Sequence, residues 1–249
     1  VEDISPMDGY ELIIVPTNMH QTEAALETLV PVSGQAIFLV FSGNWEGTDS
    51  IDRLLPRERY LMGYADGGGT IRDGVYWVNL GAEVHIGEVD GKPTDKLEKV
   101  KALFVRADMQ PDVQANIVHW LWQHAAGAVG FALGFAKHGD LKIFLNDKDL
   151  LHQCVLSTKE LYRLCALSGV DLRKFPEAGF VNFPVWLVSL LVRWNLGHRE
   201  SAQRYSAHAA SKGSRQEMQV YYADVMSTAT DLGFDMLYTK ALGAYLNYA

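Results

Sequence analysis

Cysteine is scarce in this chain, with only Cys154 and Cys165 among its 249 residues. The two residues lie eleven positions apart in a stretch whose pattern predicts a helix, so we expect buried thiols rather than a disulfide. Chains without disulfides are typical of reducing compartments, and we therefore expect a cytoplasmic location.

Clustered positive charge is also absent. The formal net charge is -8 and the sequence pI is about 5.5. Proteins that bind phosphate backbones gather Lys and Arg on one surface, and no such cluster occurs here. We predict no nucleic-acid partner, and no spacing of His, Cys, Asp and Glu predicts a metal site.

Long hydrophobic runs are missing as well. The longest strongly apolar run covers residues 185–192, far short of the roughly 20 residues that span a bilayer, and no signal-peptide pattern is visible. We expect no membrane partner. What is present, 48% apolar and 21% charged residues, is the usage of a globular protein with a sizeable core.

The first part of the chain has the pattern of an α/β protein. Residues 11–15 and 35–41 are short apolar runs, and 20–29 has helical spacing between them. Continuous apolar strands alternating with a helix indicate a parallel sheet. The second run leads into the polar, glycine-rich stretch 42–47, at the strand end where ligands bind in such sheets. By spacing alone this stretch is either a ligand-binding loop or an ordinary turn before a helix at 49–55.

Closely spaced strands follow, which we expect to form antiparallel hairpins at an edge of the sheet. The expected strands are 60–64, 70–72, 75–80 and 83–86. Three consecutive glycines at 67–69 lack the spacing of a phosphate-binding loop, so we predict a flexible turn there.

From residue 94 onward the pattern is helical. The expected helices cover residues 94–107, 111–139, 147–168, 185–194, 201–232 and 236–248, with a proline-interrupted stretch at 175–184. The predicted fold class is thus α/β followed by all-α. We expect two domains, 1–108 and 109–249, with a ligand site between them because domain interfaces are preferred sites.

The predicted helix 111–139 carries an unusual histidine. Ile117, Trp120, Leu121, His124, Ala128 and Phe131 recur at helical spacing and predict one buried face. Alanines and glycines around His124 leave room for another backbone or for a ligand. His124 is therefore either a packed core histidine or part of a site.

Five motifs in order resemble the ketopantoate reductase family. They are DGYELIIVPTNMHQTEAAL at 8–26, FLVFSGNWEG at 38–47, VHIGEVDG at 84–91, LWQH at 121–124, and QRYSAH through SRQEM between 203 and 218. The resemblance covers essentially the whole chain. It implies the second half of a Rossmann-like sheet with antiparallel edge strands in 1–108, and a helical substrate and dimerisation domain in 109–249.

The resemblance also implies an activity: reduction of a 2-oxo acid, or a related small ketone, with NADPH as the cofactor and a homodimer as the expected assembly. The asparagine that contacts the nicotinamide in the family corresponds to Asn44, and the lysine proposed as the family's acid corresponds to His124. The family's substrate-binding pair corresponds to Gln203 and Ser206. The family's glutamate on the last long helix corresponds to Glu217.

The chain departs from the family pattern at several positions. A second lysine is replaced by Asn18, which we place with Asn44 at the cofactor, and two asparagines are replaced by Ala128 and Ala132. A site without these cations and amides loses the groups that discriminate polar substrates, so we expect a less polar substrate than ketopantoate. Histidine can still act as a general acid.

The largest departure is the absence of a G-x-G-x-x-G turn, on which the family binds the pyrophosphate. The match begins midway through the Rossmann domain and the chain begins at Val1, so we expect that the sequence lacks its first part. The alternative is a non-catalytic binding or assembly protein that has lost the cofactor chemistry.

Overall fold

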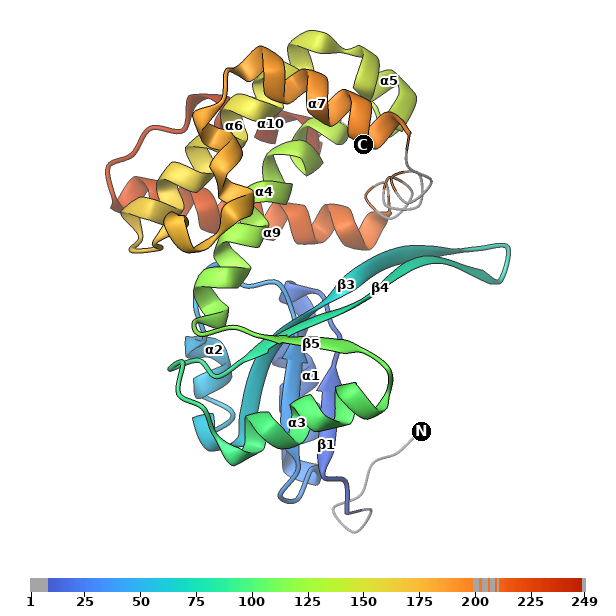
Figure 1. The fold of residues 1–249 in the computed structure, drawn as a ribbon, viewed down its shortest axis with the longest axis vertical. Coiled ribbons are helices and arrows are strands. Elements are labelled where there is room, and N and C mark those ends of the chain that lie inside the picture. Colours follow the sequence, from blue (N-terminus) through green and yellow to red (C-terminus); the bar gives the residue numbers. More distant parts are fainter. Residues whose placement is uncertain (1–8, 199–201, 203–205, 207–208, 210, 248–249) are drawn as a thin grey trace. The chain divides into compact units, whose positions relative to one another are not determined.

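The computed structural model describes residues 9–247, apart from 199–201, 203–205, 207–208 and 210 (Figure 1). The chain divides into two compact units. The first comprises Val1–Gly67 with Leu80–Leu121, and the second comprises Gly68–Asn79 with Trp122–Ala249.

A five-stranded sheet organises the first unit. Its strands, in spatial as in chain order, are β1 (Leu12–Val15), β2 (Ile37–Phe41), β3 (Tyr60–Arg72), β4 (Val75–Gly87) and β5 (Gln110–Val113). β1, β2 and β3 run parallel, with Leu12 opposite Ile37 and Phe38 opposite Tyr60. β4 and β5 also run parallel. The predicted parallel strands and antiparallel hairpin are confirmed, but the hairpin is not the edge of the sheet, because β5 lies beyond β4.

The hairpin differs from the prediction in length. β3 and β4 are continuous strands of 13 residues each, and the glycines at 67–69 lie inside β3 rather than in a flexible turn. The turn is made instead by Asp73 and Gly74, whose φ angles are 51° and 77°. A two-residue hairpin turn needs positive φ at both positions to match the twist of its strands. Gly69 lies against Val78 of β4, where a side chain would collide.

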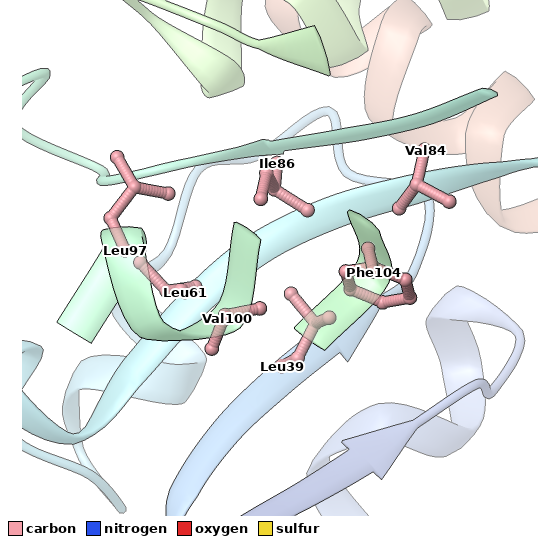
Figure 2. Close-up of a cluster of buried hydrophobic side chains, with 7 residues drawn as sticks. All are labelled: Leu39, Leu61, Val84, Ile86, Leu97, Val100 and Phe104. Carbon is pink, nitrogen blue, oxygen red and sulfur yellow. The ribbon is translucent and has the colours of Figure 1, made fainter. Parts of the chain in front are cut away.

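Helix α3 (Asp95–Arg106) covers one face of this sheet. The Thr94 hydroxyl caps it by accepting a hydrogen bond from the Leu97 N–H at 3.2 Å. Figure 2 shows the core that results, in which helix side chains meet strand side chains from β2, β3 and β4. Its buried members are Leu39, Leu61, Val84, Ile86, Leu97, Val100 and Phe104. Burial of each large aliphatic side chain contributes roughly 1.5–3 kcal/mol.

Short helical elements complete the first unit. They are η2 (Met19–Gln21), α1 (Thr22–Leu29), η3 (Val30–Val32), α2 (Asp49–Asp52) and η4 (Arg57–Arg59). Among the described residues, no helix in either unit is long and apolar enough to cross a membrane.

The second unit is helical. Its described helices are α5 (Leu141–Asn146), α6 (Lys148–Leu167), η5 (Leu172–Lys174), η6 (Pro176–Asn182), α7 (Val185–Gly197), α9 (Lys212–Asp231), α10 (Leu237–Gly243) and η7 (Ala244–Asn247). Aspartates cap three of them: the side chains of Asp140, Asp147 and Asp171 accept hydrogen bonds from the N–H groups of Ile143, Leu150 and Arg173. Cys154 and Cys165 are buried free thiols, as predicted.

Helix α4 (Ile117–Phe135) crosses the boundary between the units. The predicted start at residue 111 was wrong, because Pro111 and Asp112 belong to strand β5. Asn116 caps the helix instead, and its side-chain oxygen accepts from the His119 N–H at 2.9 Å. The helix also ends earlier than predicted, at Phe135, and a turn at 136–138 leads to Gly139, which has a φ of 62°.

Candidate functional site

In the first unit, a chain of hydroxyl groups joins the loops that follow β1 and β2. The Thr22 hydroxyl lies 3.0 Å from that of Thr17 and donates to the Ser42 Oγ at 2.8 Å. Thr22 and Ser42 are buried, at 6% and 4% exposure. β1 and β2 are parallel neighbours, so their carboxyl ends meet at one edge of the sheet, and these hydroxyls hold the two loops together there. Sequence reasoning included Ser42 in the stretch 42–47 but missed Thr22, which lies inside the predicted helix 20–29.

Asn44 shapes the loop after β2. Its Nδ2 donates to the Gly47 carbonyl, and its Oδ1 accepts from the Gly47 N–H at 2.8 Å. Gly47 has a φ of 88°, which favours glycine. Trp45 anchors the same loop in the core at 2% exposure. The stretch 42–47 is thus a closed, rigid turn that positions its own backbone at the strand end.

Asn18 holds the loop after β1 through hydrogen bonds to Gln21. Its carbonyl accepts from the Gln21 N–H at 2.9 Å, and its own N–H donates to the Gln21 side chain at 3.3 Å. The Gln21 side chain thus reaches back to the N-cap N–H, as in a capping box, at the start of η2, which leads the chain into α1. The structure therefore brings together the loops of Asn18 and Asn44, the two residues predicted at the cofactor.

A second polar cluster lies where β4 and β5 end. The His85 ring stacks on Trp120 with centroids 3.9 Å apart, and its Nδ1 lies 3.1 Å from Asp112 Oδ2. Gln114 donates to the same carboxylate at 2.5 Å. Sequence reasoning missed the cluster because Asp112 was assigned to a helix start.

His124 lies on α4 in the second unit and is half-buried. Ala128 and Ala132 lie one and two turns later on the same side of the helix. Ala128 is exposed, and Ala132 is half-buried. The predicted buried face is confirmed up to Leu121, but beyond it the prediction was wrong. The buried residues there include Ala125, Ala126, Val129 and Leu133.

Packing against α6 explains this change of face. A Cβ added at Gly127 or Gly130 would lie only 3.0 Å from the Tyr162 hydroxyl or 2.7 Å from the Thr158 hydroxyl. The small residues of α4 thus admit α6 on one side. His124, three residues before Gly127, lies at the margin of this contact, next to alanines.

The neighbour of His124 points into the protein. Gln123 is 1% exposed, and its Nε2 donates to Glu177 Oε1 at 2.8 Å. Consecutive residues on a helix point about 100° apart, so Gln123 anchors α4 against η6 while His124 keeps a different direction.

The remaining predicted residues also belong to the second unit. Glu217 lies on α9 and is half-buried. Ser206 lines a cavity of about 890 Å³ formed mainly by α5 and the second half of α7. His124 and Glu217 are not among the described residues that line it. Gln203 lies outside the described residues.

Comparison with known proteins found similarity in structure only. No family model and no curated protein matches this chain. Among solved structures, a putative ketopantoate reductase from Ralstonia solanacearum MolK2 matches with a TM-score of 0.72 and 16% identity, over 98% of this chain and 78% of that one.

Two further structures are similar. The 2-dehydropantoate 2-reductase from Geobacter metallireducens GS-15 has a TM-score of 0.73 and 12% identity, over 98% of this chain and 79% of that one. D-mandelate dehydrogenase in complex with NADH has a TM-score of 0.71 and 13% identity, over 96% of this chain and 78% of that one. The chain therefore has the fold of the ketopantoate reductases, a sheet unit of Rossmann type followed by a helical unit.

Proposed function

We propose that this protein is an oxidoreductase that uses a nicotinamide cofactor to reduce the carbonyl of a 2-oxo acid, or of a related small ketone, to a hydroxyl group. The observation that carries the proposal is the match of almost the whole chain, in both units, to the fold of enzymes named for that class of reaction. Ketopantoate reductases and D-mandelate dehydrogenase share this fold despite different substrates, so the fold alone does not name the substrate.

The loops after β1 and β2 fit the nicotinamide side of such a cofactor. They lie at the carboxyl edge of a parallel sheet, where this class of fold binds dinucleotides. Their shape is held internally by Thr22, Ser42 and Asn44, so they need no reorganisation to receive a ligand. No G-x-G-x-x-G turn occurs in the 249 residues, so the pyrophosphate has no recognisable cradle within this sequence.

We assign the cofactor contacts to Asn18 and Asn44. When bound, the reduced nicotinamide supplies the hydride that the carbonyl carbon accepts. NADPH is the proposed form. NADH belongs in the same test, because it is bound in the D-mandelate dehydrogenase structure.

His124 is the proposed proton donor to the carbonyl oxygen. An imidazolium can give up a proton near neutral pH, which suits general acid catalysis. Its position on the unburied side of α4, with Ala128 and Ala132, supports the role and favours a substrate less polar than ketopantoate. Glu217 is proposed to assist His124, and Gln203 and Ser206 to hold the substrate carboxylate.

The expected reaction can be tested with purified protein. Oxidation of NADPH and NADH is followed at 340 nm with ketopantoate and with straight-chain, branched and aromatic 2-oxo acids. Replacing His124→Gln should lower kcat at least about 100-fold, the usual range for loss of a general acid, while KM changes less. His152→Gln, a histidine of α6 with no proposed role, should leave turnover unchanged. Equal turnover in the two variants would remove His124 from the mechanism.

The alternative is a non-catalytic binding protein with the same fold. It is favoured by one observation, that the Asn44 amide is engaged by Gly47 of its own loop. Calorimetric titration with NADPH and with NADH distinguishes the two functions. A binding isotherm with either nucleotide supports the reductase, and the absence of heat with both supports the alternative.

A homodimer stays a prediction, and one solved structure with this fold is described as a dimeric ketopantoate reductase from Staphylococcus aureus.

A further inference from the structure

A tyrosine of α6 lies against α4 close to His124. The Tyr162 side chain belongs to the core of the helical unit, because the residue is only 2% exposed. Its ring meets that of Phe180 in η6 edge to face, with the ring centroids 5.5 Å apart. Its hydroxyl oxygen lies 3.0 Å from the position that a Cβ would take at Gly127 of α4. The buried ring therefore holds the hydroxyl in one place.

The Tyr162 hydroxyl has no hydrogen-bond partner among the residues that the structure describes. A hydroxyl that leaves water without gaining a partner is unfavourable, so most such groups in folded proteins are paired. Gly127, beside the hydroxyl, is half-buried, and the next residue, Ala128, is exposed. The hydroxyl therefore lies at an opening in the surface, where a bound ligand can supply the acceptor.

Other hydroxyls of α6 are paired within the protein. Thr158 lies against Gly130 in the same helix contact, and its hydroxyl donates to the Cys154 carbonyl at 2.9 Å. The Ser157 hydroxyl lies 2.8 Å from the Thr239 hydroxyl. Tyr162 differs from these two residues because its donor is available to a ligand.

The surroundings keep Tyr162 protonated. Burial, and after it the charge of the Glu177 carboxylate, raise the pKa of Tyr162 well above its ordinary value of 10. Glu177 is itself held by Gln123 of α4, whose Nε2 donates to it at 2.8 Å. The Tyr162 hydroxyl is therefore a hydrogen-bond donor rather than a base throughout the neutral range.

The hydroxyl and His124 can reach one common atom. His124 precedes Gly127 by three residues, so the Cβ positions of the two are roughly 5–6 Å apart. The hydroxyl lies next to the Gly127 position, and the imidazole extends beyond its own Cβ. One oxygen atom can therefore lie within hydrogen-bond distance of both groups, about 2.7–3.1 Å from each donor.

We propose that the Tyr162 hydroxyl is a second hydrogen-bond donor to the substrate oxygen that His124 protonates. The inference rests on the proposed reduction. As the carbonyl carbon accepts the hydride of the reduced cofactor, the π electrons of the carbonyl move to the oxygen, which takes a proton from the His124 imidazolium. Tyr162 keeps its own proton, and its hydrogen bond stabilises the negative charge that develops on that oxygen.

Tyr162→Phe tests the proposal, because it removes the hydroxyl and keeps the ring. It should lower kcat about 100-fold with little change in KM, the usual effect of losing one donor to a developing oxyanion. Thr158→Val is the matched control in the same helix contact and should leave kcat unchanged, because the Thr158 hydroxyl already donates to Cys154. Both variants should keep the urea midpoint of the natural sequence. Equal kcat values for the natural sequence and Tyr162→Phe would overturn the proposal.

Binding of oxamates gives a second readout that needs no turnover, since an amide replaces the reactive ketone in these analogues of 2-oxo acids. Calorimetry with oxamate and N-phenyloxamate, in the presence of NADH or NADPH, should show about 10-fold weaker binding to Tyr162→Phe and unchanged binding to Thr158→Val. If no 2-oxo acid is reduced but Tyr162→Phe still weakens oxamate binding, the reduction fails and the hydroxyl contact stands. Equal affinities, or a natural sequence that binds neither oxamate, would overturn the contact.

Discussion

At the scale of single residues, Asp147 is the carboxylate with the clearest electrostatic environment. His138 Nε2 lies 2.9 Å and Lys137 Nζ 3.0 Å from its Oδ2, and its Oδ1 accepts from the Leu150 N–H. These contacts, the histidine first, lower the pKa of Asp147 to about 2. The folded protein therefore stabilises the ionised form of Asp147 relative to the protonated form.

This environment predicts a pH-dependent contribution to stability. A lowered pKa in the folded state stabilises the protein above the unfolded value of 3.8, and the contribution is lost as the pH falls from there towards 2. Asp147→Asn keeps a capping side chain but removes the charge. It should lower the free energy of unfolding by about 1–2 kcal/mol at pH 7, and the difference should disappear near pH 2.

Urea unfolding at a series of pH values measures this effect. Asp171→Asn is the control, because Asp171 also accepts a backbone N–H and pairs with Arg173, but on the open surface. Exposed pairs contribute little, so this variant should unfold like the natural sequence. A pH-independent deficit in Asp147→Asn would contradict the charge argument.

The sequence could propose candidate site residues, which stay a prediction, but it could not give their contacts. The order of motifs was enough to select Asn18, Asn44 and His124. Only the folded loop shows that the Asn44 amide binds Gly47, because both groups can instead bond to water in an extended chain.

At the scale of elements, the contact between α4 and α6 depends on glycine. Gly134 of α4 lies so close to Cys154 of α6 that an added Cβ would collide with the sulfur atom. Gly134→Ala should therefore destabilise the protein by about 1–3 kcal/mol, the usual cost of overpacking a filled core. Chemical denaturation measures the change.

Two further variants show whether the collision is the cause. Gly179→Ala is the control for the loss of glycine itself, since open space surrounds Gly179 and a Cβ there meets no atom within 4 Å. It should be neutral or slightly stabilising. Adding Cys154→Ala to Gly134→Ala should restore part of the lost stability, and a double variant weaker than both single ones would exclude the steric explanation.

Elements were predicted well where local patterns were strong. The strands β1 and β2 and the helices α3, α6 and α7 lie within a few residues of their expected bounds. β5 was missed because its four residues include a proline and carry no alternation of apolar and polar side chains. The three glycines of β3 resembled a turn in the sequence. Their place in a strand depends on pairing with β4, which the residues next to them do not reveal.

At the scale of the whole molecule, each unit has its own core, and both cysteines belong to the core of the second unit. Burial raises the pKa of Cys154 and of Cys165 to about 12. Neither thiol should react with a thiol-specific reagent in the native protein, because the reactive thiolate is scarce and inaccessible.

Thiol labelling should therefore report the unfolding of the helical unit. The reaction of both cysteines should follow the urea transition. A Leu237→Cys variant should add one thiol that reacts without denaturant, because position 237 is 62% exposed. Rapid labelling of Cys154 or Cys165 in native buffer would show that this core opens locally.

The sequence by itself determined the class of fold. Apolar periodicity, capping residues and the order of motifs depend on neighbours along the chain, so they can be recognised without coordinates. The tertiary structure decided which side of α4 is buried and which loops meet at the sheet edge. These outcomes depend on which distant segments pack together. The face of α4 that carries His124 stays only partly buried because α6 packs on the neighbouring side, which carries Gly127, Gly130 and Gly134.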